Sequence, residues 1–195
     1  MMVEKHALPL VYALVPILLL MLLVAWAVGM YNSLVRSRMR TREAWSGVEV
    51  QLKRRASLIP NLVETVRGYA GHEHSVFTEV AQARGALANA ATPAAAAAAD
   101  QSLTMTLGRL MAVAENYPQL QAASGFGKLQ SELQDTEEKV AYARQFYNQN
   151  ALDYNARIQS FPGNQFARMF SFEPVAFFAA EESAYNDVKV SFSAA

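Results

Sequence analysis

The sequence predicts an all-α protein, in which an N-terminal transmembrane helix is followed by a long antiparallel four-helix bundle. Three observations carry this prediction. Residues 8–30 contain no charged side chain across 23 positions, and a bilayer core needs roughly 20 apolar residues in helical form. Further along, apolar residues recur at intervals of three and four, which is the spacing of an amphipathic helix. No stretch offers several alternating strands in series, and short connections between helices favour antiparallel neighbours.

The apolar segment 8–30 is interpreted as a retained membrane anchor. Pro16 lies inside it, and transmembrane helices tolerate such a residue. A cleaved signal peptide is the competing interpretation, because Ala25-Trp26-Ala27 resembles a small-x-small cleavage site. The apolar run is longer than a usual signal core, and four arginines follow it closely. They form a juxtamembrane basic collar that consists of Arg36, Arg38, Arg40 and Arg42.

This basic collar also predicts the topology. Basic clusters beside a span tend to remain in the cytoplasm, and the opposite flank offers only Lys5 and His6, offset by Glu4. We therefore expect residues 1–7 to be a short extracytoplasmic segment and the bulk of the chain to be cytoplasmic. The expected partner at this end is the lipid bilayer, whose anionic head groups attract basic residues. The alternative interpretation is that these arginines are solvated residues at the start of a helix and a topology signal, without a role in binding lipid.

Composition excludes several classes of site. The chain has no cysteine, which removes disulfides, thiolate metal sites and a cysteine nucleophile. The formal net charge is zero, so no global field recruits nucleic acid, and no nucleic-acid partner is expected.

The bundle is predicted from four apolar stripes. The first runs through residues 42–71, keeps its phase across Pro60 and predicts a bend there, with no strong breaker between Met30 and Trp45. A second stripe covers residues 76–90, and the alanine-rich stretch 88–99 is a loop or an extended helix end. Asp100 is expected to cap the third helix. The fourth stripe, at residues 126–158, ends at Phe161-Pro162-Gly163. The bundle thus occupies 31–163, and 164–195 is a C-terminal segment packing on it, in which Val188, Val190 and Phe192 alternate as in a short extended stretch.

These residues resemble the LemA family, with similarity from about Tyr31 to Phe178. The resemblance rests on segments such as Ala44-Trp45-Ser46-Gly47-Val48, Leu58-Ile59-Pro60-Asn61-Leu62 and Ala112-Val113-Ala114-Glu115-Asn116-Tyr117-Pro118. The positions that carry the family signature are Trp45, Gln51, Leu52, Pro60, Tyr117, Pro118, Tyr147, Asn148, Tyr154, Asn155, Phe161 and Pro162.

The resemblance implies a bacterial inner-membrane protein with a short external N-terminus, an antiparallel four-helix domain and no established catalytic activity. Some members of the family are associated genetically with membrane proteases or envelope processes. This chain departs from the family pattern at Glu49 and Ser57, where Asp is common, and at Ser171, where Phe-Gly-Phe is more usual than Phe-Ser-Phe.

No catalytic, cofactor-binding or metal-binding residue is predicted. His72 and His74 flank Glu73, but a spacing of two directs ligands on a helix apart. The candidate docking surface for an acidic partner or lipid head group is formed by Lys53, Arg54, Arg55 and Asn61. The alternative is a kinked helix in which Asn61 satisfies the backbone groups that Pro60 frees.

The pairs Tyr147-Asn148 and Tyr154-Asn155 recur at an interval of seven residues. Both tyrosines lie on the inward stripe, so their hydroxyls need partners. The asparagines could either supply these partners or fix the register of the helix. Core specificity is favoured over ligand binding. The phenylalanine-rich tail is expected to pack over one end of the bundle; if exposed, it would mark a partner or membrane contact.

The function predicted from these features is that of a non-catalytic, membrane-anchored interaction or scaffold module that self-associates into a homo-oligomer. Two alternatives remain open. One is a regulatory partner of a membrane protease or envelope-stress system. The other is an enzyme of unknown reaction that uses the bundle core as a pocket.

Overall fold

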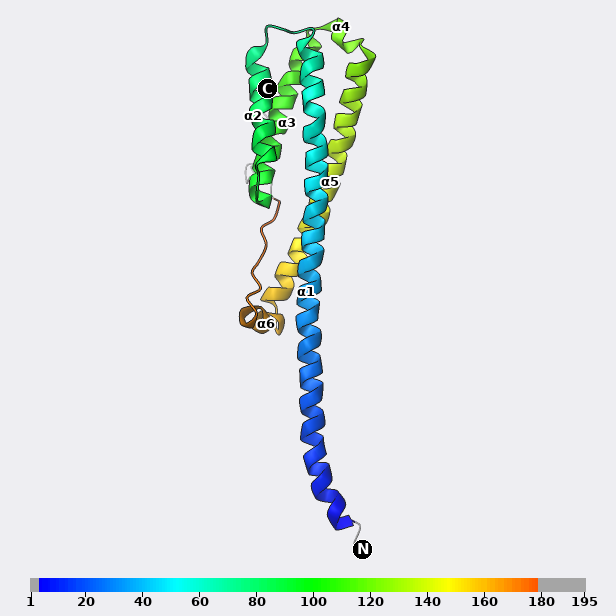
Figure 1. Ribbon diagram of the computed structural model, residues 1–195, viewed down its shortest axis with the longest axis vertical. Coiled ribbons are helices and arrows are strands. Elements are labelled where there is room, and N and C mark those ends of the chain that lie inside the picture. The colour runs from blue at the N-terminus through cyan, green and yellow to red at the C-terminus, as the bar shows by residue number, and fades with distance from the viewer. Residues whose placement is uncertain (1–3, 179–195) are drawn as a thin grey trace, which may run out of the picture. The chain divides into compact units, whose positions relative to one another are not determined.

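A computed structural model describes residues 4–178, and its regular secondary structure is helical, which confirms the all-α prediction (Figure 1). An extended segment follows the last helix. The alternating stretch expected at Val188–Phe192 lies outside the described residues. The elements in chain order are α1 (Glu4–Arg67), α2 (His74–Ala88), α3 (Pro93–Glu115), α4 (Pro118–Gln121), α5 (Ser124–Gln159) and α6 (Gly163–Met169).

Helix α1 is a single element of 64 residues, so the apolar segment 8–30 and the first bundle helix are continuous, in agreement with the lack of a strong helix breaker between Met30 and Trp45. It continues through Pro60 without ending. Among the described residues, this is the one helix long and apolar enough to cross a bilayer. Its most apolar window has a mean hydropathy of 2.4, and none of that window is buried. The helix is therefore compatible with a single membrane anchor.

The chain divides into two compact units. The larger unit contains residues 43–151 together with Ala176–Phe178 from the described part of the tail. Its core is built from the inward stripes of α1, α2, α3 and α5, and α2 packs directly against α3. The stripes are those that the three-and-four spacing predicted. The buried side chains include Val48, Leu52, Ile59, Leu62, Val66, Phe77, Val80, Leu103, Leu107, Leu110, Leu133 and Val140.

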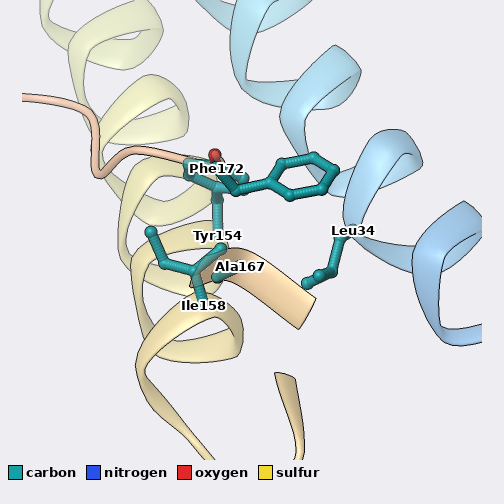
Figure 2. Close-up of a cluster of buried hydrophobic side chains, with 5 residues drawn as sticks. All are labelled: Leu34, Tyr154, Ile158, Ala167 and Phe172. Atoms are coloured by element: carbon teal, nitrogen blue, oxygen red, sulfur yellow. The ribbon is translucent and has the colours of Figure 1, made fainter. Parts of the chain in front are cut away.

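The smaller unit contains the start of α1, to Arg42, and residues 152–175. Its core brings together side chains from α1, the end of α5, α6 and the segment after α6 (Figure 2). Gly163 at the start of α6 is required by close packing, because a Cβ there would overlap the carbonyl oxygen of Arg157. The buried cluster consists of Leu34, Tyr154, Ile158, Ala167 and Phe172.

Helix α3 begins earlier than predicted. Thr92 is its N-cap, since the Thr92 hydroxyl accepts a hydrogen bond of 3.2 Å from the Ala95 amide, and Pro93 takes the first helical position, where its missing N–H costs nothing. The expectation that Asp100 caps this helix is wrong, because Asp100 lies well inside it. Of the two alternatives for the alanine-rich stretch, the extended helix end is correct from Pro93 onward.

Two short helices were not predicted. They are the single turn α4, which follows Tyr117, and α6, which follows the stop at Pro162. After α6, Ser171 has a φ of 54°, a left-handed conformation that glycine adopts without steric cost. This conformation gives a physical reason for the glycine that is more usual at this place in the family.

Candidate functional site

Within the smaller unit, Tyr154 and Asn155 bind the backbone of the extended segment that follows α6. The Tyr154 hydroxyl donates to the carbonyl of Glu173 at 2.9 Å. The Asn155 side chain makes two hydrogen bonds to a single residue: its amide donates to the Val175 carbonyl at 2.9 Å, and its oxygen accepts from the Val175 amide at 2.9 Å. All of these tail groups are main-chain atoms, so the contact does not depend on tail side chains.

The same arrangement occurs within the larger unit. The Tyr147 hydroxyl donates to the Ala176 carbonyl at 2.6 Å. Asn148 donates to the Phe178 carbonyl at 2.9 Å and accepts from the Phe178 amide at 2.8 Å. The four side chains Tyr147, Asn148, Tyr154 and Asn155 are called the Tyr-Asn ladder below.

The Phe178 side chain adds an apolar anchor to this second set of contacts. It is 1% exposed, and its ring lies 6.3 Å from that of Trp45, which also contacts Tyr147 edge-on at 5.4 Å. The Arg144 guanidinium lies 4.7 Å from the centre of the Phe178 ring, within the range of a cation–π contact. The last described residue is thereby fixed by both main-chain and side-chain contacts.

The repeat of seven in the ladder matches a repeat of three in the tail. Seven residues of α-helix rise about 10.5 Å, and three residues of extended chain advance about 9–10 Å. Asn155 and Asn148 accordingly bind Val175 and Phe178, which are three residues apart. The seven-residue interval is therefore what a helix needs to bind an extended chain at regular steps.

The ladder corrects one expectation from the sequence. The asparagines do not satisfy the tyrosine hydroxyls; both residue types bind the tail backbone instead. Desolvation by burial raises the pKa of Tyr147 and of Tyr154, the latter against the opposing effect of Arg38 and Arg42. Both hydroxyls remain donors at neutral pH. The sequence of the tail could not identify the tail as the partner of these side chains, because an extended segment bound through its main chain has no amphipathic pattern of its own.

A buried ion pair links α1 to α3. Arg55 Nη1 lies 2.7 Å from Asp100 Oδ1, and the two side chains are only 3% and 4% exposed. Arg55 Nη2 also donates to Thr104 Oγ1 at 3.1 Å, whereas the Arg55 Nε has no hydrogen-bond partner within the described structure. Burial raises the pKa of Asp100, although Arg55 and Arg144 act in the opposite direction.

The burial of Arg55 corrects its assignment to the docking surface, because this guanidinium is not available to a partner. Arg54 is half exposed and lies 3.6 Å from Asp135, while Lys53 and Asn61 are exposed. A docking role for Lys53, Arg54 and Asn61 stays a prediction.

The carbonyl freed by Pro60 is satisfied from another helix. Proline has no N–H, so the Ala56 carbonyl, four residues earlier, loses its usual helical partner. Arg84 on α2 supplies the replacement, with its Nε 3.0 Å from that oxygen. The alternative in which Asn61 plays this role is wrong. Arg84 also lines a cleft of about 290 Å³ among α1, α2 and α3.

The larger unit has a second, open cleft between α1 and α5. Ala44 and Gly47 line its α1 side, and Tyr142 and Phe146 line its α5 side. Tyr142 is 73% exposed and Phe146 52% exposed. Val50, 57% exposed, lies on α1 three residues after Gly47 and hence on the same side of that helix. This set of residues is called the α1/α5 face.

The remaining predicted positions are distributed over several elements. The four arginines of the basic collar are exposed on α1. Tyr117 is the N-cap of α4 and Pro118 begins that helix, whereas Phe161 and Pro162 lie in the connection between α5 and α6. Gln51 carries a buried side-chain oxygen with no hydrogen-bond partner in the part of the chain described here. Among residues 4–178, no group of three or more potential metal ligands comes together, His72 and His74 included.

The fold and these contacts define a class of protein: a helical bundle that shares its first helix with one candidate membrane span. The LemA family model matches residues 44–192. The chain belongs to the LemA family.

Two kinds of relative show how far the similarity extends. The chain is 29% identical over 174 residues to the magnetosome proteins MamQ 1 and MamQ 2 of Paramagnetospirillum magneticum, a match that covers 76% of this chain. The match spans 64% of the length of these relatives. The chain is also 26% identical over 165 residues to protein LemA of Metamycoplasma hominis, covering 84% of this chain and 75% of that protein.

Proposed function

We propose that this protein is a membrane-anchored, non-catalytic interaction module of the bacterial inner membrane, with its N-terminus outside and its bundle in the cytoplasm. The observation that carries the proposal is the continuity of α1 from Glu4 to Arg67. One helix supplies both the candidate span and a buried stripe of the larger unit. The bundle is thus joined to the anchor by hydrogen-bonded helix and not by a flexible linker.

A contact made by Trp26 supports a retained anchor over a cleaved signal peptide. The Trp26 ring lies 5.8 Å from that of Phe166, edge to face. Cleavage after Ala27 would remove Trp26 and with it one half of this pair. A segment that contributes packing to the folded chain is better explained as a permanent part of it.

The polar side chains of the larger unit support binding over catalysis. Asp100 and Arg55 are paired with each other, Arg84 is engaged with a backbone carbonyl, and Tyr147 and Asn148 hold the tail. Each of these groups has a structural partner. A catalytic site would instead direct such groups toward a shared space where a substrate could lie.

Self-association is supported by the α1/α5 face. Val50, Tyr142 and Phe146 each expose more than half of their surface, and Ala44 and Gly47 leave room beside them. Aromatic side chains beside small residues suit a self-complementary helical contact. The proposed occupant is the same face of a second copy.

The experiment that tests this proposal places a photo-cross-linking amino acid at Tyr142 in the full chain, in cells. Met105 on α3, which is 58% exposed, is the matched control. Position 142 should give a product with twice the mass of the chain and containing this chain alone, and position 105 should not. If the cross-linked product at position 142 instead contains this chain and a different protein in a one-to-one ratio, self-association is wrong and the chain is an adaptor. If that protein is a membrane protease, the regulatory alternative is correct.

Topology is tested separately because the chain has no native cysteine. A cysteine introduced by Asn89→Cys, in the connection between α2 and α3, should resist a membrane-impermeant maleimide in intact cells and react after lysis. Labelling in intact cells would contradict the cytoplasmic assignment of the bundle.

A further inference from the structure

The smaller unit carries a set of exposed apolar side chains at the turn between α5 and α6 and at the end of α6. Phe161 is 82% exposed, Met169 73% and Phe170 49%. Two exposed arginines, Arg157 and Arg168, lie close to them in sequence. Apolar residues gathered in this way, with basic neighbours, are typical of segments that lie in a membrane interface. These five residues are called the α6 foot.

The position of the α6 foot relative to the candidate span is fixed by aromatic contacts within the smaller unit. Phe166 on α6 contacts Trp26 at 5.8 Å, and Phe170 contacts Tyr31 edge-on at 4.8 Å. Trp26 lies inside the apolar segment 8–30, and Tyr31 directly follows it. Trp and Tyr are the residues that gather where hydrocarbon meets head groups.

These contacts set the depth of α6. A hydrocarbon core about 30 Å thick takes roughly 20 of the 23 apolar residues, so its edge falls between about residue 27 and residue 30. Trp26 then lies up to about 6 Å inside that edge, at 1.5 Å of rise per residue. Head groups add only about 5–7 Å on each side of the core. An element whose ring packs on Trp26 therefore lies at head-group depth and not in bulk water.

We propose that the α6 foot is a second membrane contact, in which Phe161, Met169 and Phe170 enter the interface of the leaflet on the bundle side and Arg157 and Arg168 meet its phosphates. The proposal rests on the anchor described under the proposed function. Arg157 also donates to Ser33 on α1 at 3.1 Å, which ties the end of α5 to the residues just beyond the span. The occupant is a lipid surface because the foot continues the apolar surface of the span itself.

The experiment uses single cysteines in the full chain, reconstituted in vesicles and labelled with an environment-sensitive fluorophore. The test positions are Phe161→Cys and Met169→Cys. Met39→Cys is the matched control, because Met39 is 54% exposed on α1 and lies about 13 Å beyond Met30 at 1.5 Å per residue. Leu22→Cys, 59% exposed, reports on the anchor. Vesicles of phosphatidylcholine with 30% anionic phosphatidylglycerol, with and without brominated acyl chains, supply the quencher.

The expected result is quenching by brominated lipid at positions 22, 161 and 169, with position 39 much less affected. If position 22 is quenched while 161 and 169 behave like 39, the α6 foot does not contact lipid and the anchor stands. A blue-shifted but unquenched label at 161 or 169 would show that protein covers the foot, and would overturn the proposal in favour of a partner. Absence of quenching at position 22 would contradict the proposal that α1 is a membrane anchor, and with it the proposal that the α6 foot contacts lipid.

Discussion

The substitution Asp100→Asn removes the negative charge of the buried ion pair while keeping the shape of the side chain. Arg55 is 2% exposed, and its Nε already has no hydrogen-bond partner among residues 4–178, so it cannot turn to water for compensation. Glu137 lies 3.9 Å away but is more than half exposed, and its interaction with Arg55 is weakened by solvent. Removing one partner of a buried pair costs about 3–5 kcal/mol. We expect the lower end, about 3 kcal/mol, because the asparagine oxygen still accepts a hydrogen bond.

The assay is urea unfolding of the full chain in lipid nanodiscs, followed by Trp45 fluorescence in a Trp26→Phe background, which leaves one tryptophan. A loss of about 3 kcal/mol corresponds to roughly a 150-fold change in the unfolding equilibrium. The double variant Arg55→Met with Asp100→Leu should recover most of this loss, since replacing a buried pair by apolar residues is often neutral.

The control is Asp135→Asn, an exposed carboxylate that pairs with Lys139 at 2.7 Å and Arg54 at 3.6 Å. It should leave the midpoint unchanged, because exposed pairs contribute little. Two outcomes would refute the reasoning: a loss at Asp100→Asn below about 1 kcal/mol, or a double variant as unstable as the single one. Either would mean that the pair is not desolvated.

Three further predictions concern backbone contacts. Asn155→Ala leaves the main-chain groups of Val175 without their partners and should make the tail more sensitive to limited proteolysis, with a cost of about 1–3 kcal/mol; a protease pattern like that of the native chain would argue against the ladder. Arg84→Met removes the side-chain donor to the Ala56 carbonyl, and because this contact is exposed it should destabilise the chain to chemical unfolding by only about 0.5–1.5 kcal/mol; the effect should shrink when Pro60→Ala restores the helical donor, and equal losses in both backgrounds would contradict this. Burial raises the pKa of Tyr154. The contribution of the neutral Tyr154 hydroxyl to stability should therefore be complete below about pH 10 and be lost as the pH rises through the pKa of the folded state. Tyr154→Phe should flatten the dependence of unfolding on alkaline pH, and an unchanged dependence would contradict this prediction.

The helices were predictable because their apolar residues repeat on one face. The stripe around Leu52 and Leu62 predicted α1, and the long run to Ile158 predicted α5. The N-terminus of α3 was missed although Thr92-Pro93 is a helix-start signal, because the alanines that follow suggested little to bury. In the structure Ala96 and Ala97 are buried at 3%, where small size permits close packing.

The contacts of the site were less predictable. Arg84 and the Ala56 carbonyl are 28 residues apart in sequence, and Arg55 and Asp100 are 45 apart. A single sequence carries no signal that joins such pairs. The repeat of Tyr147 and Tyr154 did signal an unusual helix, but its partner is main chain, which every residue possesses.

Main-chain recognition by the Tyr-Asn ladder has a consequence for how the tail can vary during evolution. The ladder uses the amides of Val175 and Phe178 and the carbonyls of four residues. Proline is therefore tolerable wherever the amide is unused, as the natural Pro174 illustrates, and is forbidden at positions 175 and 178. Apart from the ring of Phe178 and the side chains of Phe172 and Val175, which pack in the cores, the segment can exchange its side chains while its main-chain hydrogen bonds to α5 are kept.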